Sequence, residues 1–91
     1  DLGDNQVFGA IQISPNPATD QLNVRYLLNQ DAQVQVLLLD MTGRAVFQQN
    51  VRGIAGEQNL RLDLGTVPAG LYALQVRALD QVYSEKVVLR K

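Results

Sequence analysis

The stretch Leu60–Val76, LRLDLGTVPAGLYALQV, decides the fold class of this chain. Apolar residues alternate with polar ones in its first part, and the alternation resumes from Tyr72 onward. A period of two places every second side chain on one face, which is typical of a strand that covers a core with that face. The proline and glycines of the GTVPAG segment between the two parts predict a compact turn. The stretch is therefore expected to form two strands joined by a turn.

The same alternation recurs on both sides of this stretch. Gly, Pro, Asn and Asp residues separate the alternating blocks, and no sustained helical stripe occurs. Seven strands are expected, at 7–13, 21–28, 33–40, 44–51, 57–64, 71–79 and 82–90. Seven short strands with turn signals every 8–12 residues predict an all-β fold, an immunoglobulin-like antiparallel β-sandwich. Because the Cys–Trp–Cys pattern of true immunoglobulin domains is absent, the likeness concerns the architecture alone.

Composition narrows the range of functions. The 91 residues suit one small domain, with 46% hydrophobic and 19% charged residues. The chain has no Cys and no His, which removes disulfides, thiolate metal sites and the commonest general base. We therefore expect no enzyme activity, no catalytic residues, no metal site and no cofactor. The nearest approach to a calcium loop, Asp1, Asp4 and Asn5, is too sparse in oxygen ligands.

Charge and hydropathy exclude further classes. Eight Lys and Arg residues are interspersed with nine Asp and Glu residues, for a net charge of -1. We therefore expect no basic face for nucleic acid or anionic lipid, and no nucleic-acid partner. The longest apolar run, Val36–Leu39, is far too short for a transmembrane segment. The chain begins with Asp1 and ends in a strand-like block, so it is expected to be the C-terminal piece of a longer polypeptide.

Four segments together resemble a known family. They are ISPNPA at 13–18 followed by Leu22-Asn23-Val24, VLLLDMTGRAV at 36–46, LDLGTVPAGLYALQV at 62–76, and KVVLRK at 86–91. In this order they resemble the C-terminal sorting domain, type A, of proteins that Bacteroidetes export by the type IX (Por) secretion system. Two departures, Leu39 for the usual aromatic and Val67 for the common leucine, keep the apolar character.

The resemblance implies a sorting signal without catalytic activity. Such domains cross the periplasm, engage the type IX outer-membrane translocon and a shuttle protein, and reach the cell surface, outer membrane or extracellular space. A cell-surface sortase then removes the domain in many members and joins the cargo to anionic lipopolysaccharide. Some isolated members form a homodimer by strand exchange. The alternative function is an accessory binding module for protein or glycan within a secreted surface protein.

The resemblance also implies a set of site residues. Recognition by the translocon is expected at the end of the chain, at Lys86, Val87, Val88, Leu89, Arg90 and Lys91. The family-motif turn residues are Pro15, Asn16, Pro17, Asp40, Gly43, Pro68, Gly70 and Tyr72. Residues 1–10 are expected to hold the linker end, a cleavage region with Gly3, Gly9 and Ala10 as small-residue candidates, and the start of the first strand. Residues 11–91 are expected to form the sorting domain.

Physical reasoning adds two expectations about these residues. Pro15 and Pro17 are expected to fix the entry of the chain and to separate linker from core. The final strand, Val82–Lys91, is expected to be an edge strand whose unpaired backbone groups can accept a partner strand. The alternative for this strand is an ordinary edge whose Lys86, Arg90 and Lys91 act as charged gatekeepers.

Overall fold

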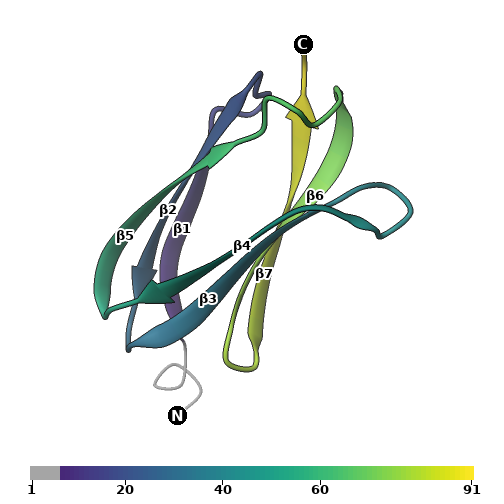
Figure 1. The fold of residues 1–91 in the computed structure, drawn as a ribbon. Helices are drawn as coiled ribbons and strands as arrows, with labels where there is room; N and C mark the ends of the chain where they lie inside the picture. Colours follow the sequence, from purple (N-terminus) through teal and green to yellow (C-terminus); the bar gives the residue numbers. More distant parts are fainter. Residues whose placement is uncertain (1–6) are drawn as a thin grey trace.

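Alternating side chains give this chain strands that each bury one face. The computed structural model describes residues 7–91, which form seven antiparallel strands and no helix (Figure 1). The strands are β1 (Phe8–Ser14), β2 (Gln21–Leu28), β3 (Ala32–Leu39), β4 (Ala45–Gly53), β5 (Gly56–Asp63), β6 (Gly70–Ala78) and β7 (Gln81–Leu89). Each predicted strand is present, and its bounds differ by at most two residues from those expected.

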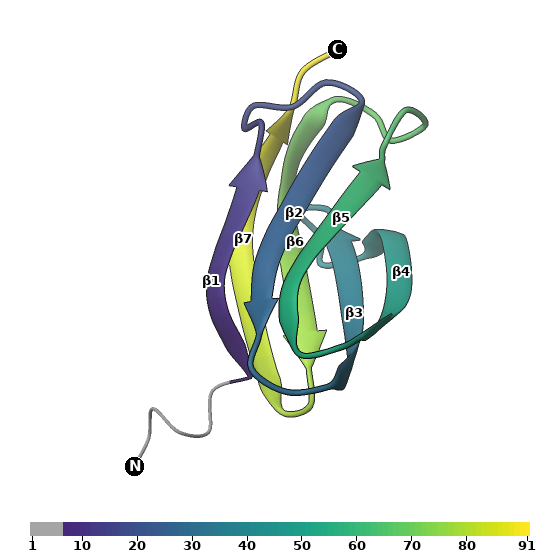
Figure 2. The same cartoon turned by 90° about the vertical axis from the view of Figure 1, so that its left-hand side faces the viewer.

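The strands form two sheets packed face to face. One sheet has the order β1-β2-β5 and the other the order β4-β3-β6-β7, with every named strand pair antiparallel (Figures 1 and 2). In immunoglobulin constant domains the fourth strand joins the first sheet. Here β4 pairs with β3, which widens the second sheet to four strands. The sandwich predicted from the sequence is confirmed, with this arrangement of its middle strands.

The core lies between the two sheets and consists of the inward residues of the alternating pattern. Leu22, Leu38, Leu62 and Leu74 are 0% exposed, and no buried residue among those described is polar or charged. Phe8 and Tyr26 also pack here as an edge-to-face pair, with ring centroids 6.1 Å apart. Burial of these side chains supplies the main stabilisation of a domain that has no disulfide.

Tight turns join the strands of the four-stranded sheet. Gly43 has a φ of 87° in the turn between β3 and β4, a left-handed backbone conformation that glycine adopts readily. The β6–β7 hairpin has a two-residue loop, since Ala78 pairs with Gln81, and Leu79 in that loop has a φ of 54°. The tip of the β3–β4 hairpin projects away from the body of the sandwich (Figure 1).

The proline pair lies inside the fold. Pro15 and Pro17 follow β1 and connect it to β2, and β1 pairs with β2 from Phe8 to Ser14. The expectation that the prolines separate linker from core is wrong, because the strand before them already belongs to the sandwich. Both Ser14–Pro15 and Asn16–Pro17 peptide bonds are cis. The start of β1 and the end of β7 lie at opposite ends of the sandwich (Figures 1 and 2).

Candidate functional site

The side chains of the last strand divide between core and surface. Val87 is 0% exposed and Leu89 is 2% exposed, so both belong to the core. Alternation places Lys86, Val88 and Arg90 on the outer face of the four-stranded sheet, where Lys86 and Arg90 are exposed and Val88 is half-buried. Of the terminal residues predicted for recognition, these three can present side chains to a partner, while Val87 and Leu89 hold the strand in place.

Lys91 folds back onto a neighbouring turn. Its Nζ donates to the carbonyl oxygens of Leu64 and Gly65 at 2.8 and 3.1 Å, and lies 3.8 Å from Oδ1 of Asp20. The ammonium group thereby satisfies two carbonyls in the turn after β5. Lys91 therefore anchors the end of the chain to the turn after β5.

The outer edge of β7 is partly covered by the proline motif. The Asn16 side chain donates to the carbonyl of Lys86 at 2.9 Å and accepts from the N–H of Val88 at 3.2 Å. The N–H of Ala18 donates to the carbonyl of Val88, and the N–H of Arg90 donates to the carbonyl of Ala18, both at 2.8 Å. We call residues 16–18 the latch.

The latch corrects the expectation of an edge that is free along its whole length. It occupies the outward backbone groups of β7 from the carbonyl of Lys86 to the N–H of Arg90. In an edge strand, the backbone N–H and C=O groups of every second residue point away from the neighbouring strand. Before the latch, the residues of β7 whose backbone groups point this way are Val82 and Ser84. The edge is therefore closed next to the end of the chain, and within residues 7–91 no backbone hydrogen bond from another segment closes it at Val82 and Ser84.

The turn between β3 and β4 is organised by one carboxylate. Oδ1 of Asp40 accepts hydrogen bonds from the backbone N–H and hydroxyl of Thr42, at 2.9 and 2.6 Å, and from the N–H of Arg44 at 3.0 Å. The hydrogen bond from the Thr42 hydroxyl, then that from the Arg44 N–H, holds the pKa of Asp40 below its usual value. Asp40 and Gly43 both lie in this turn, and the N–H of Gly43 also donates to the carbonyl of Asp40 at 3.0 Å.

The turn between β5 and β6 is held in a similar way by a side chain. The hydroxyl of Tyr72 donates to the carbonyl of Pro68 at 2.6 Å, and its ring is 7% exposed. A Cβ atom built on Gly70 would lie 3.6 Å from this ring. Pro68, Gly70 and Tyr72 thus form one packed corner of the fold.

An apolar depression of about 320 Å³ lies where these motif segments meet. Leu39, Met41, Leu71 and Ala73 provide its apolar wall, and Lys86 and Asp40 are its charged lining residues. The carboxylate of Asp40 is engaged within its own turn. The depression is on the outer face of the four-stranded sheet, since Leu39 pairs with Ala73 and Ala73 pairs with Lys86. Sequence reasoning did not identify this site. The sequence feature that could have indicated it is the apolar run Val36–Leu39, which places leucine at outward as well as inward positions of β3.

The charged residues at outward strand positions of the same face are all basic, a local pattern that the interspersed charges of the sequence do not reveal. Arg52, Arg77, Lys86 and Arg90 all occupy outward positions of this sheet or its immediate end. No Asp or Glu occupies an outward strand position there among the described residues. The strand period of two decides which charged side chains share a face, and a net charge of -1 does not reveal this local excess of one sign.

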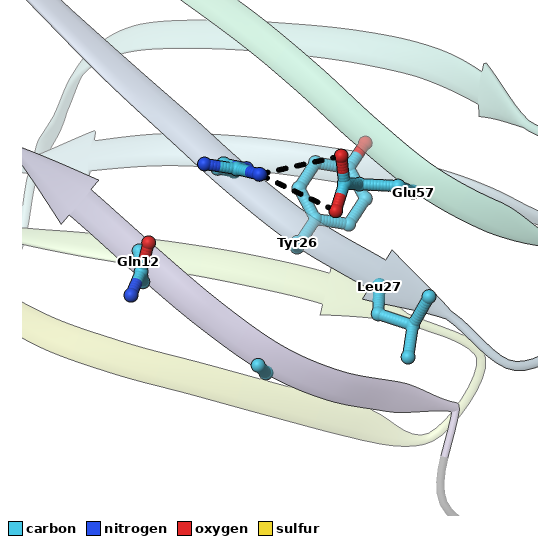
Figure 3. A pocket seen from close by; sticks show the side chains of 6 residues that line it. Gln12, Tyr26, Leu27 and Glu57 are labelled. Carbon is cyan, nitrogen blue, oxygen red and sulfur yellow. Dashed lines mark hydrogen bonds and ion pairs between the residues drawn. The ribbon is translucent and has the colours of Figure 1, made fainter.

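Other depressions carry no recognisable chemistry. One of about 340 Å³ lies over the three-stranded sheet, beside the exposed Arg25–Glu57 pair at 3.4 Å (Figure 3). Another, of about 440 Å³, lies between β1 and the start of β7. No group of three or more potential metal ligands occurs within residues 7–91. In the same residues no helix is long and apolar enough to cross a membrane.

Comparison with known proteins identifies the family. The family model described as a secretion system C-terminal sorting domain matches residues 12–90. The chain belongs to this family. A search of curated proteins finds no match. As a sorting domain of type IX secretion, it interacts with the secretion system and is exported toward the cell surface or the extracellular space.

The remaining candidate residues lie at three places in the sorting domain. Gly9 and Ala10 are exposed positions of β1, and Gly3 lies outside the described residues. The fold brings the Asp40–Gly43 turn, the start of β6 and Lys86 together around the apolar depression. It keeps Pro15, Asn16 and Pro17 at the outer edge of β7, where Asn16 forms part of the latch. This family is a family of sorting signals and not of enzymes.

Proposed function

We propose that this domain directs its parent protein across the periplasm and through the type IX translocon to the cell surface. The observation that carries the proposal is the family match over residues 12–90. The shuttle protein receives the exported chain, and a surface sortase removes the domain and joins the cargo to anionic lipopolysaccharide. The domain itself is the substrate of these steps, in keeping with a chain that has no His and no Cys.

In this proposal, the translocon binds side chains on the outer face of the terminal strand. Lys86, Val88 and Arg90 are the residues that make contact, because Val87 and Leu89 are committed to the core. Deleting the last five residues would remove those core side chains, and a loss of export would then report unfolding as much as lost recognition. Single charge reversals on the exposed face separate the two effects.

The test uses a reporter fused ahead of residues 1–91 in a host with a functional type IX system. We expect the fusion to reach the surface and Lys86→Glu to reduce its surface amount by about tenfold, since a like-charge contact costs several kcal/mol. Arg61→Glu is the matched control, because Arg61 is exposed on the other sheet and carries the same change of charge. Equal melting temperatures of the purified variants establish that folding is unaffected.

Two results would reject the proposal in different ways. Retention of the unmodified fusion inside the cell would reject the sorting function itself. Normal export of the Lys86→Glu fusion, with folding intact, would reject the assignment of recognition to the terminal strand.

The alternative of a glycan-binding module lacks a stacking surface. Sugar rings bind on exposed aromatic faces. Phe8, Tyr26 and Tyr72 are buried, and Phe47 and Tyr83 are half-buried. These are all the aromatic residues of the chain, so no observation favours this alternative over sorting.

A further inference from the structure

We propose that the outer face of the four-stranded sheet docks an acidic, partly apolar segment of a partner protein. The proposal rests on the proposed function in assigning that partner to the secretion machinery. It extends the contact surface well beyond the terminal strand, onto β3, β4 and β6.

The face is organised in rows, because residues paired across antiparallel strands point to the same side. From the hairpin end of β7 toward the latch, the rows follow the observed register. The first two rows are Arg52–Gln33 and Asn50–Gln35–Arg77–Val82. The middle row is Gln48–Leu37–Gln75–Ser84. The last two rows are Leu39–Ala73–Lys86 and Leu71–Val88. Basic and amide side chains thus dominate the first rows, and apolar side chains dominate the last ones.

Every charged side chain at an outward strand position of this face is basic. Its cations are Arg52, Arg77 and Lys86, with Arg90 following at the end of β7. Glu85, next to Lys86 in the sequence, lies on the opposite face of β7, where its carboxylate accepts from the Tyr83 hydroxyl at 2.6 Å. The acidic residues at positions 31, 40 and 80 lie in the loops at the ends of the sheet. The carboxylates of the first two already bind loop groups, including the N–H of Ala55 at 2.7 Å. A partner surface with carboxylates therefore has complementary charge here.

The side chain of Arg77 is held in a conformation that suits binding of a carboxylate. Its Nε and Nη2 donate to Oε1 of Gln75 at 3.2 and 2.6 Å, which holds the side chain along β6. A guanidinium has five N–H donors in a fixed fork, so donors remain for a carboxylate. Fixing the side chain beforehand lowers the entropy lost on binding.

The apolar rows supply a place for an uncharged side chain. Met41 is 73% exposed and Leu71 is 39% exposed beside the depression of about 320 Å³. A depression of that size accepts one or two side chains, and Lys86 at its rim can pair with a neighbouring carboxylate. The arrangement fits an extended segment in which apolar and acidic residues follow one another.

A protein partner fits this face better than a lipid surface does. Five amide side chains, Gln33, Gln35, Gln48, Asn50 and Gln75, occupy the rows between the cations. Each amide both donates and accepts, which matches the mixed hydrogen-bonding groups of a polypeptide. The apolar part of the face is a depression rather than a protruding surface. Proteins that lie in a membrane interface commonly use an amphipathic helix, and residues 7–91 contain no helix.

The direct test is titration of the ¹⁵N-labelled domain with a synthetic ten-residue peptide of alternating Glu and Leu. We expect amide shift changes concentrated on Arg77, Lys86, Leu39 and Met41, which weaken at high salt. A peptide of alternating Lys and Leu is the control and should leave these signals unchanged. Equal shifts with both peptides, or shifts spread over both sheets, would overturn the proposal.

Charge reversals assign the binding to the face. Arg77→Glu should weaken binding of the Glu–Leu peptide at least about tenfold, since it replaces an attraction by a repulsion. Arg61→Glu on the opposite sheet should leave it within about twofold. Equal losses in both variants would mean that only net charge matters and would overturn the proposal. The proposal would also be overturned if the domain sedimented with phosphatidylglycerol vesicles, in a manner that depends on Arg77, and did not bind the peptide.

An export assay separates this inference from the proposed function. If the unmodified reporter fusion is exported, Arg77→Glu should lower its surface amount whereas Arg61→Glu should not. Normal export of Arg77→Glu would reject the inference and leave sorting through the terminal strand standing. If the unmodified fusion is not exported, the sorting function fails, and the peptide titration alone decides whether the face binds acidic segments.

Discussion

Leu79 holds the turn between β6 and β7 in a backbone conformation that leucine rarely adopts. Its φ is 54°, and its side chain is 65% exposed. Left-handed backbone costs an ordinary L-residue about 1–2 kcal/mol, whereas Gly and Asn tolerate it. We expect Leu79→Asn to raise the free energy of unfolding by about 0.5–1 kcal/mol, measured by chemical denaturation. Leu79→Ala is the control, because it removes the exposed side chain without relieving the backbone; an equal gain in both variants would contradict the prediction.

The carboxylate of Asp40 couples stability to pH. Its folded pKa lies below its unfolded value, so it contributes stability above the unfolded pKa of about 4, and this contribution is lost as pH falls through the folded pKa. We expect Asp40→Ala to lower the melting temperature near neutral pH, with a difference from the unmodified domain that shrinks under acid. Thr42→Ala, which removes the hydroxyl donor, should show a smaller effect of the same form. A difference that does not vary with pH would contradict this account.

At the scale of elements, the latch joins segments from opposite ends of the chain. Asn16→Ala removes two of its four hydrogen bonds to β7, each worth about 0.5–1.5 kcal/mol. We expect hydrogen exchange at the Val88 amide to become faster by about tenfold, while the Val87 amide, which faces β6, keeps its protection. Thr19→Ala in the same connection is the control. Equal acceleration at both amides would mean that the whole strand opens, as the strand exchange expected from the resemblance would require.

The strands could be predicted from the sequence because alternation and turn residues are local signals. The alternation of Leu22, Val24 and Tyr26 indicates a strand and its buried face without any knowledge of its neighbours. The latch could not be predicted in this way, since Asn16 and Lys86 are 70 residues apart and neither carries a mark of its partner. The outward leucines of β3 were missed because an apolar run does not show which of its members face the core.

At the scale of the whole molecule, the two outer faces differ in charge. The charged residues at outward strand positions of the four-stranded sheet are all basic, whereas the other sheet exposes Arg25 and Arg61 together with Glu57 and Asp63. The start of β1 and the end of β7 also lie at opposite ends of the sandwich (Figure 2). In the proposed function, cargo joined ahead of β1 therefore enters at the end of the sandwich opposite to the end of the terminal strand.

For the sortase step of the proposed function, the beginning of the sandwich sets an expected position of the cut. Val7 is 2% exposed; its N–H donates to Oε1 of Gln81 and its carbonyl accepts from the N–H of Asn29, both at 2.8 Å. A protease needs an extended chain in its active site, so cutting at Gly9 or Ala10 would require β1 to leave the sheet. We therefore expect the cut before Val7, and the mass of the domain released by a sortase-competent host should include Val7 and all that follows. A released domain that begins at Gly9 or later would show that the sortase acts on an opened sandwich, with β1 detached from β2.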